Sequence, residues 1–192
     1  MMLHPAFKHP VDDAQQTFRS LLDALAQPLR LSALPCLPPA LPGLSRGSAA
    51  LLYTLIDRDV SLWLPSLPDD TLASLRFHTG MNLAANPAEA DFLLLTAGTP
   101  LPPLSTLKAG SDAYPDRSAT LLIEIEAFNQ DQVIGSGPGI PHTRRFGADG
   151  LPGDFWHQWQ ANHARFPLGV DAILIADDRI AGLPRTTRIQ EG

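Results

Sequence analysis

The sequence predicts an α/β protein, in which helices cover both faces of a sheet. Short apolar runs typical of buried strands, such as residues 92–96 and 172–176, alternate with segments whose apolar residues recur at helical spacing. Buried strands that alternate with helices favour a parallel or mixed sheet. At 192 residues the chain can bury a substantial core, and we expect a single domain over residues 1–192.

The first helix is predicted over residues 11–26, where Phe and Leu side chains recur at helical spacing. Asp12 or Asp13 can cap its start, and Pro28 ends it. A short strand is expected to follow over residues 29–34.

Three further helices are predicted over residues 48–56, 69–77 and 154–164. The candidate caps are Ser45 or Ser48 for the first of these and Asp69 or Asp70 for the second. Strands are predicted at residues 60–64, 92–96, 121–125, 133–134 and 172–176, with edge strands at Ile180 and at 186–189.

Composition excludes several classes of protein. A net charge of −6 and a pI of about 5.4 argue against a free-standing nucleic-acid binder. The sequence lacks an apolar run of about eighteen residues, so we expect no membrane span, and its beginning resembles no signal peptide. A lone cysteine, Cys36, excludes an internal disulfide and is typical of the reducing cytoplasm.

Hydrophobic residues make up 44% of the chain and charged residues only 18%, which suggests a surface that meets a partner. The chain has 19 prolines, many of them in residues 34–43 and 99–103, and these stretches predict extended loops. The segment at 35–42 is either a packed surface loop or an arm that docks a partner.

A glycine-rich turn at residues 135–139 is the first candidate for chemistry, because such turns can point backbone N–H groups at a phosphate. No lysine follows it and two nearby prolines lack donors, so a structural hairpin is favoured. Arg144 lies just beyond, and a local anion site built from Gly137, Gly139 and Arg144 is the alternative.

Two more arginines are candidates for anion binding. Arg117 could hold a phosphate, although the favoured interpretation is that Asp116 caps a turn and Arg117 pairs with a nearby carboxylate. Asp171 and Arg185 bracket the last predicted hairpin, and a structural ion pair is favoured there over a ligand site.

We predict no catalytic residue and no metal ligand. The six histidines have no metal-site spacing with a third ligand nearby, and nothing marks Cys36 as a nucleophile. The only lysines, Lys8 and Lys108, do not suit a pyridoxal phosphate Schiff base, so no cofactor is expected.

The chain resembles the PhnH family, the H subunits of the bacterial carbon–phosphorus lyase core complex. The C-terminal block from Phe166 to Thr187 carries the resemblance most clearly, and shorter matches precede it in the family's order. These matches lie at residues 15–25, 51–57 with 61–64, 77–80, 90–92, 114–120 and 137–140. One departure is Pro28-Leu29, where family members usually have Pro-Gly; leucine does not readily adopt the positive φ open to glycine.

The resemblance implies a three-layer αβα sandwich with a mixed sheet, similar to the large domain of pyridoxal-phosphate-dependent transferases but without the cofactor lysine. It implies an accessory subunit that joins the G, I and J subunits and forms a homodimer in isolation. The complex transfers a ribosyl triphosphate from ATP to an alkylphosphonate and releases adenine, in the catabolism of phosphonates.

Two alternatives stay open beside the accessory role. In one, the chain itself binds a phosphonate, ribose phosphate or nucleotide, and Arg117, Arg144 and Arg185 line an anion pocket at the carboxyl ends of the strands. In the other, the chain is a stand-alone enzyme, for which the sequence offers no residue set.

Overall fold

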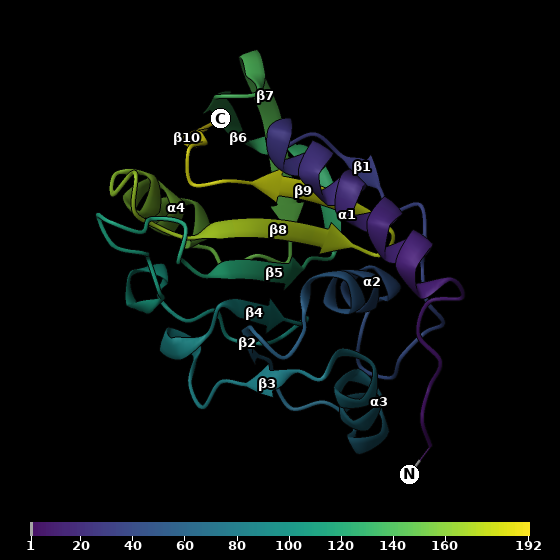
Figure 1. Ribbon diagram of the computed structural model, residues 1–192. Helices are drawn as coiled ribbons and strands as arrows, with labels where there is room; N and C mark the ends of the chain where they lie inside the picture. Colours follow the sequence, from purple (N-terminus) through teal and green to yellow (C-terminus); the bar gives the residue numbers. More distant parts are fainter. Residues whose placement is uncertain (1) are drawn as a thin grey trace.

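The computed structural model describes residues 2–192, and its centre is a seven-stranded mixed sheet (Figure 1). The strand order is β1-β9-β8-β5-β4-β2-β3, with β3, β2, β4, β5 and β8 parallel and with β9 and β1 each antiparallel to its inner neighbour. The strands are β1 (Ser32–Ala33), β2 (Ser61–Trp63), β3 (Asn82–Leu83), β4 (Phe92–Leu95), β5 (Thr120–Glu124), β8 (Asp171–Ala176) and β9 (Arg179–Leu183). The predicted α/β class with a mixed sheet is confirmed.

A second, three-stranded antiparallel sheet in the order β10-β6-β7 was not predicted. Its strands are β6 (Ala127–Gly137), β7 (Ile140–Asp149) and β10 (Arg188–Glu191). We call the hairpin of β6 and β7 the ribbon. Its register shifts twice, between Asn129 and Val133 and between Gly135 and Gly137. Such bulges break the alternation of apolar and polar residues, which is why sequence periodicity indicated a strand only at 133–134.

Four α-helices flank the main sheet: α1 (Pro10–Ala26), α2 (Arg46–Leu55), α3 (Asp69–Thr79) and α4 (Phe155–His163). The helices α1, α2 and α3 cover one face (Figure 1), while α4 and the second sheet cover the other. The expected third layer is therefore only partly helical. Two short 3-10 turns, η1 (Pro87–Glu89) and η2 (Leu104–Thr106), complete the elements.

The central strands send alternate side chains into two separate cores. In β5, Leu122 packs into the core beneath α1, α2 and α3, whereas Leu121 and Ile123 pack into the core beneath α4 and the ribbon. We call these cores the helix-side cluster and the ribbon-side cluster. The helix-side cluster includes Leu51, Leu94, Leu122 and Ile173, and the ribbon-side cluster includes Leu93, Leu121, Phe146, Phe155 and Trp159.

The helix starts confirm some predicted caps and correct others. Ser45 caps α2, since its side chain accepts a hydrogen bond from the Ser48 N–H at 3.1 Å. The N-cap of α1 is His9, and Asp13 acts from the first turn by accepting the His9 N–H at 2.9 Å. The prediction that an aspartate caps α3 was wrong, because Pro68 is the N-cap and both aspartates lie in the first turn, where their charge favours the helix dipole.

The segment after α1 is where Pro28-Leu29 departs from the family pattern. Leu29 adopts a left-handed conformation with φ of 61°, so the extended strand expected over residues 29–34 shortens to Ser32–Ala33. The Leu29 N–H donates to the Gly182 carbonyl at 2.9 Å, and its side chain is buried. Ile180, expected in an edge strand, lies in β9, which is an interior strand because β1 pairs beyond it.

Within residues 2–192, the helices are too short or too polar to cross a lipid bilayer.

Candidate functional site

The strongest ion pair joins Arg185 and Asp171 at the amino ends of β5 and β8. Asp171 opens β8 opposite Thr120, and both of its carboxylate oxygens accept hydrogen bonds from the Arg185 guanidinium. The Arg185 backbone N–H also donates to Asp171, at 2.7 Å. The structural pairing favoured from the sequence is confirmed.

Arg185 also ties neighbouring loops together. Its Nη1 donates to the Pro115 carbonyl at 2.8 Å and to the Pro167 carbonyl at 3.4 Å, and its Nη2 donates to the Ser118 hydroxyl. Only 11% of its side chain is exposed. A guanidinium that is occupied on every nitrogen has little capacity left for a ligand.

Arg117 lies in the loop that Arg185 holds, but its own side chain is exposed. Its guanidinium stacks over the Tyr114 ring, 4.2 Å from the ring centre. The expected pairing with a carboxylate is not formed among residues 2–192, whose ion pairs are Lys108–Asp91 and Arg185–Asp171.

Gly137 and Gly139 form the turn of the ribbon, with φ of 131° and 81°. A Cβ at Gly137 would lie 2.9 Å from the Thr186 carbonyl oxygen, and one at Gly139 only 2.2 Å from the Ala26 carbonyl oxygen. The turn therefore packs closely against backbone carbonyls, whose partial negative charge would repel an anion. This geometry supports the structural hairpin.

Arg144, on β7, reaches the carboxyl end of α1. Its Nη1 donates to the Pro28 carbonyl and, at 3.4 Å, to the Gln27 carbonyl. Cationic side chains are favoured at this end of a helix, where carbonyls lack partners within the helix. Arg144 thus fastens the ribbon to α1.

The structure does not bring the three arginines into one pocket at the carboxyl ends of the strands. Arg185 and Arg117 lie near the amino ends, and Arg144 lies on the second sheet. The pocket at the carboxyl ends of β4 and β5, about 210 Å³ in volume, has Glu124 as its one charged lining residue, and Glu124 accepts the Ser45 N–H at 2.8 Å. A carboxylate there disfavours anions.

A second polar cluster surrounds Asp91, just before β4. Its carboxylate accepts Lys108 Nζ at 2.6 Å, and the Ser61 N–H and hydroxyl at 2.9 and 2.7 Å. Partial desolvation acts to raise the pKa of Asp91, but the bonds from Lys108 and Ser61 outweigh it and lower the pKa below its usual 3.8. Lys108, expected to be a solvated loop lysine, is half-exposed and ion-paired.

A polar groove of about 520 Å³ runs between the ribbon and the segment that follows α1. Three arginines contribute to its lining, Arg30, Arg144 and Arg145, and none of its lining residues is acidic. The partly exposed Phe128 also lines it, with its ring 5.8 Å from that of Phe146. We call it the arginine groove.

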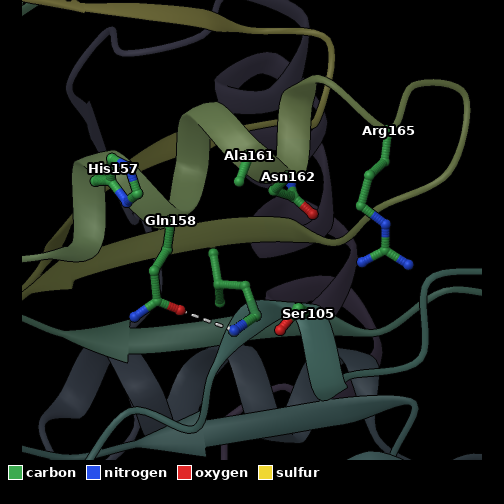
Figure 2. Close-up of a pocket in the computed structure, with 7 residues that line it drawn as sticks. Ser105, His157, Gln158, Ala161, Asn162 and Arg165 are labelled. Atoms are coloured by element: carbon green, nitrogen blue, oxygen red, sulfur yellow. Dashed lines mark hydrogen bonds between the residues drawn. The ribbon is translucent and has the colours of Figure 1, made fainter.

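A smaller pocket of about 190 Å³ lies between α4 and η2 (Figure 2). Gln158 reaches from α4 to accept the Leu104 N–H at 2.9 Å, and Arg165 extends from the segment after the helix. His157 and Ser105 lie at its rim. Its lining combines the apolar side chains of Leu104 and Ala161 with side chains that can donate hydrogen bonds, among them those of Ser105 and Arg165.

The remaining candidate residues form no reactive cluster. Among residues 2–192, no three His, Cys, Asp or Glu side chains are placed to hold a metal ion. Cys36 donates weakly to Gln16 at 3.8 Å, and partial burial, together with the nearby Asp13, raises the pKa of its thiol. A raised pKa reduces the thiolate fraction and thus the nucleophilicity of the sulfur.

Sequence reasoning missed Arg30 and Asp91 as members of polar clusters, and it noted Arg145 only as the neighbour of Arg144. Arg30 is 115 positions from Arg145 in the chain, and both line the groove because the ribbon, of which the sequence indicated only the turn and residues 133–134, packs against the segment after α1. The adjacent pair Arg144-Arg145 was the one available signal for the arginine groove.

The comparisons with known proteins cover nearly the whole chain. Residues 5–190 match the family described as bacterial phosphonate metabolism protein (PhnH). A Rhizobium meliloti protein named alpha-D-ribose 1-methylphosphonate 5-triphosphate synthase subunit PhnH is 39% identical over 190 residues, covering 96% of this chain and 94% of that protein. HtxG of Stutzerimonas stutzeri, provisionally named a C-P lyase subunit protein, is 32% identical over 178 residues, covering 91% and 85%. This chain belongs to the PhnH family.

Proposed function

We propose that this chain is an accessory subunit of a carbon–phosphorus lyase complex that transfers a ribosyl triphosphate from ATP to an alkylphosphonate. The observation that carries the proposal is the match, over 96% of the chain, to a named subunit of such a synthase. Catalysis belongs to other subunits in this proposal, and the isolated chain is expected to turn over no substrate.

The engagement of Arg185 and Lys108 within the protein supports an accessory role. Arg185 is committed to Asp171 and to two neighbouring loops, and Lys108 is held by Asp91. Lys8 precedes α1. Neither lysine is offered for a Schiff base, which fits our proposal of a fold similar to pyridoxal-phosphate-dependent transferases without their cofactor.

Exposed apolar side chains support contacts with partner subunits. Val11, Phe18 and Leu22 of α1 are 82%, 43% and 49% exposed, and Phe77 of α3 is 68% exposed. Large apolar groups in water are typical of surfaces that other proteins cover. The proposed partners are the G, I and J subunits, with a homodimer when the chain is alone, and the proposed location is the cytoplasm.

Co-expression tests the proposal. The tagged chain is expressed with the G, I and J subunits of its own source, purified, and weighed by native mass spectrometry. We expect a stable assembly that contains this chain in a defined copy number. A chain that purifies as a homodimer while the other three assemble without it would contradict the proposal.

A further inference from the structure

The charge of the arginine groove is unbalanced within the protein. The chain carries 20 acidic and only 14 basic residues, yet Arg30, Arg144 and Arg145 all contribute to one groove whose lining includes no acid. Both ion pairs formed among residues 2–192 lie elsewhere. An anion bound in this groove would meet arginines and no carboxylate among the lining residues.

The arginines keep donors available after their contacts with the protein are counted. Arg144 uses Nη1 on the carbonyls of Gln27 and Pro28, and Arg30 uses Nη1 on the Gln27 side chain. The Nε and Nη2 groups of both, and the whole guanidinium of Arg145, donate to no protein acceptor among residues 2–192. Free guanidinium edges match the paired oxygens of phosphate and phosphonate groups.

The shape of the groove favours a ligand larger than a single phosphate. Its volume is about 520 Å³, which lies in the range of small-molecule sites. The partly exposed Phe128 supplies an aromatic face beside the arginines, and aromatic faces stack on nucleobases. Thr143 adds a neutral hydrogen-bonding group.

We propose that the arginine groove binds a polyphosphate ester of a nucleoside, with the phosphates on Arg30, Arg144 and Arg145 and the base against Phe128. The proposal deepens the proposed function, because it gives this subunit a site for the triphosphate-bearing substrate class of the complex. It differs from the arginine set expected from the sequence, of which only Arg144 remains.

Calorimetric titration of the isolated full-length chain with ATP tests the groove. We expect saturable binding that weakens as salt is raised, because salt screens the guanidinium–phosphate attraction. Arg145→Ala and Arg30→Ala should each weaken binding roughly tenfold, the loss that one charge-assisted hydrogen-bonding group causes. Arg144 is left unchanged, since its bonds to the carbonyls after α1 hold the ribbon in place.

Arg76→Ala is the matched control, because Arg76 is an exposed arginine on α3 and removing it changes the net charge equally. It should leave ATP affinity within about twofold. Thermal unfolding of each variant checks that the fold is retained. Equal affinities for all three variants, or no ATP binding by the wild-type chain, would overturn the proposal.

Titration with tripolyphosphate, which has no nucleoside, separates the contribution of the phosphates from that of the base. Tighter binding of ATP than of tripolyphosphate, with the difference lost in Phe128→Leu, supports the contact with the base. Equal affinities for ATP and tripolyphosphate would overturn the contact between the base and Phe128 and leave a site for polyphosphate alone. The co-purification experiment, repeated with Arg145→Ala, separates this proposal from the subunit role. If the complex forms normally although the wild-type chain binds no ATP, the subunit role stands and the ATP site is overturned.

Discussion

Leu29 shows how one residue exchanges backbone strain for packing. A leucine with φ of 61° is strained by roughly 1–2 kcal/mol relative to glycine. Its side chain is only 2% exposed, however, and its Cδ1 occupies the space where Gly135 lacks a side chain. Burying a leucine contributes more than this strain costs, which explains how the turn forms without the Pro-Gly of the family.

At most positions an alanine variant is more stable than a glycine variant, and at Leu29 we expect the reverse order of stability. Leu29→Ala loses the packing and keeps the strain, and should destabilise the protein by about 2–5 kcal/mol. Leu29→Gly loses the same packing but relieves the strain, so we expect it to be about 1 kcal/mol more stable than Leu29→Ala. Urea unfolding of both variants measures the difference.

Leu34 provides the control, because it is equally buried, at 4% exposure, but has no positive φ. There Leu34→Ala should be more stable than Leu34→Gly by about 0.5–1 kcal/mol. The same order at both positions would contradict a left-handed Leu29.

Asp91 makes a pH-dependent contribution to stability. Its pKa is lowered by folding, so the contribution is complete above the unfolded pKa, near 3.8, and is lost as pH falls through the lower folded value. Asp91→Asn should cost stability at pH 7, and its deficit relative to wild type should shrink between pH 5 and about pH 3. Urea midpoints measured at several pH values test this sign. In a Lys108→Gln background the pH-dependent part should be smaller, and a deficit independent of pH would contradict the assignment.

The candidate residues show which contacts of a site can be predicted from the sequence and which cannot. The Asp171–Arg185 pair was predictable because both residues flank the final hairpin, and the chain between them is short. The partner of Arg117 was not predicted, because the Arg117 side chain stacks on the ring of Tyr114, in the same loop, and not against the expected carboxylate. The arginine groove depends on packing between segments far apart in the chain, which local spacing cannot show.

At the scale of elements, the ribbon is held by close backbone approach rather than by side chains alone. Gly139 has φ of 81°, and the space where its Cβ would lie is occupied by the Ala26 carbonyl oxygen, 2.2 Å away. Strain and steric clash therefore both oppose a side chain at this position.

Three alanine substitutions separate these two effects. Gly153→Ala, with no positive φ and open space, should be neutral or stabilising by up to about 1 kcal/mol. Gly98→Ala, with φ of 79° and open space, should lose roughly 1 kcal/mol through strain. Gly139→Ala should lose clearly more, about 3 kcal/mol, because the ribbon must also move away from α1. Thermal unfolding ranks them, and equal losses for Gly98 and Gly139 would contradict the close approach.

Predictability also differed among elements. The helices and the strands β4, β5 and β8 followed from periodicity, because each buries a regular set of apolar side chains. Of the second sheet, the sequence indicated only residues 133–134 and an edge strand at 186–189, which overlaps β10, because bulges disrupt the alternation in the ribbon. The strand expected over 29–34 was shortened by the left-handed Leu29, a feature that propensity does not reveal.

At the scale of the whole molecule, the two cores share the strands β4, β5 and β8, which send alternate residues into each. Such sharing should couple the two faces of the sheet. The faces can be observed separately. All three tryptophans, Trp63, Trp156 and Trp159, belong to or pack against the ribbon-side cluster, whereas α1, α2 and α3 provide most of the helical signal on the opposite face.

Urea unfolding followed by tryptophan fluorescence and by far-ultraviolet circular dichroism should therefore give coincident transitions. Leu122→Ala, which removes a fully buried side chain from the helix-side cluster only, should lower both midpoints equally, for a loss of about 2–5 kcal/mol. Leu121→Ala, its neighbour in the ribbon-side cluster, should do the same. A shared sheet transmits the loss of packing on one face to the strands that hold the other face, so both transitions should move together. If Leu122→Ala moved the dichroism transition and left the fluorescence transition in place, the two faces would be independent folding units.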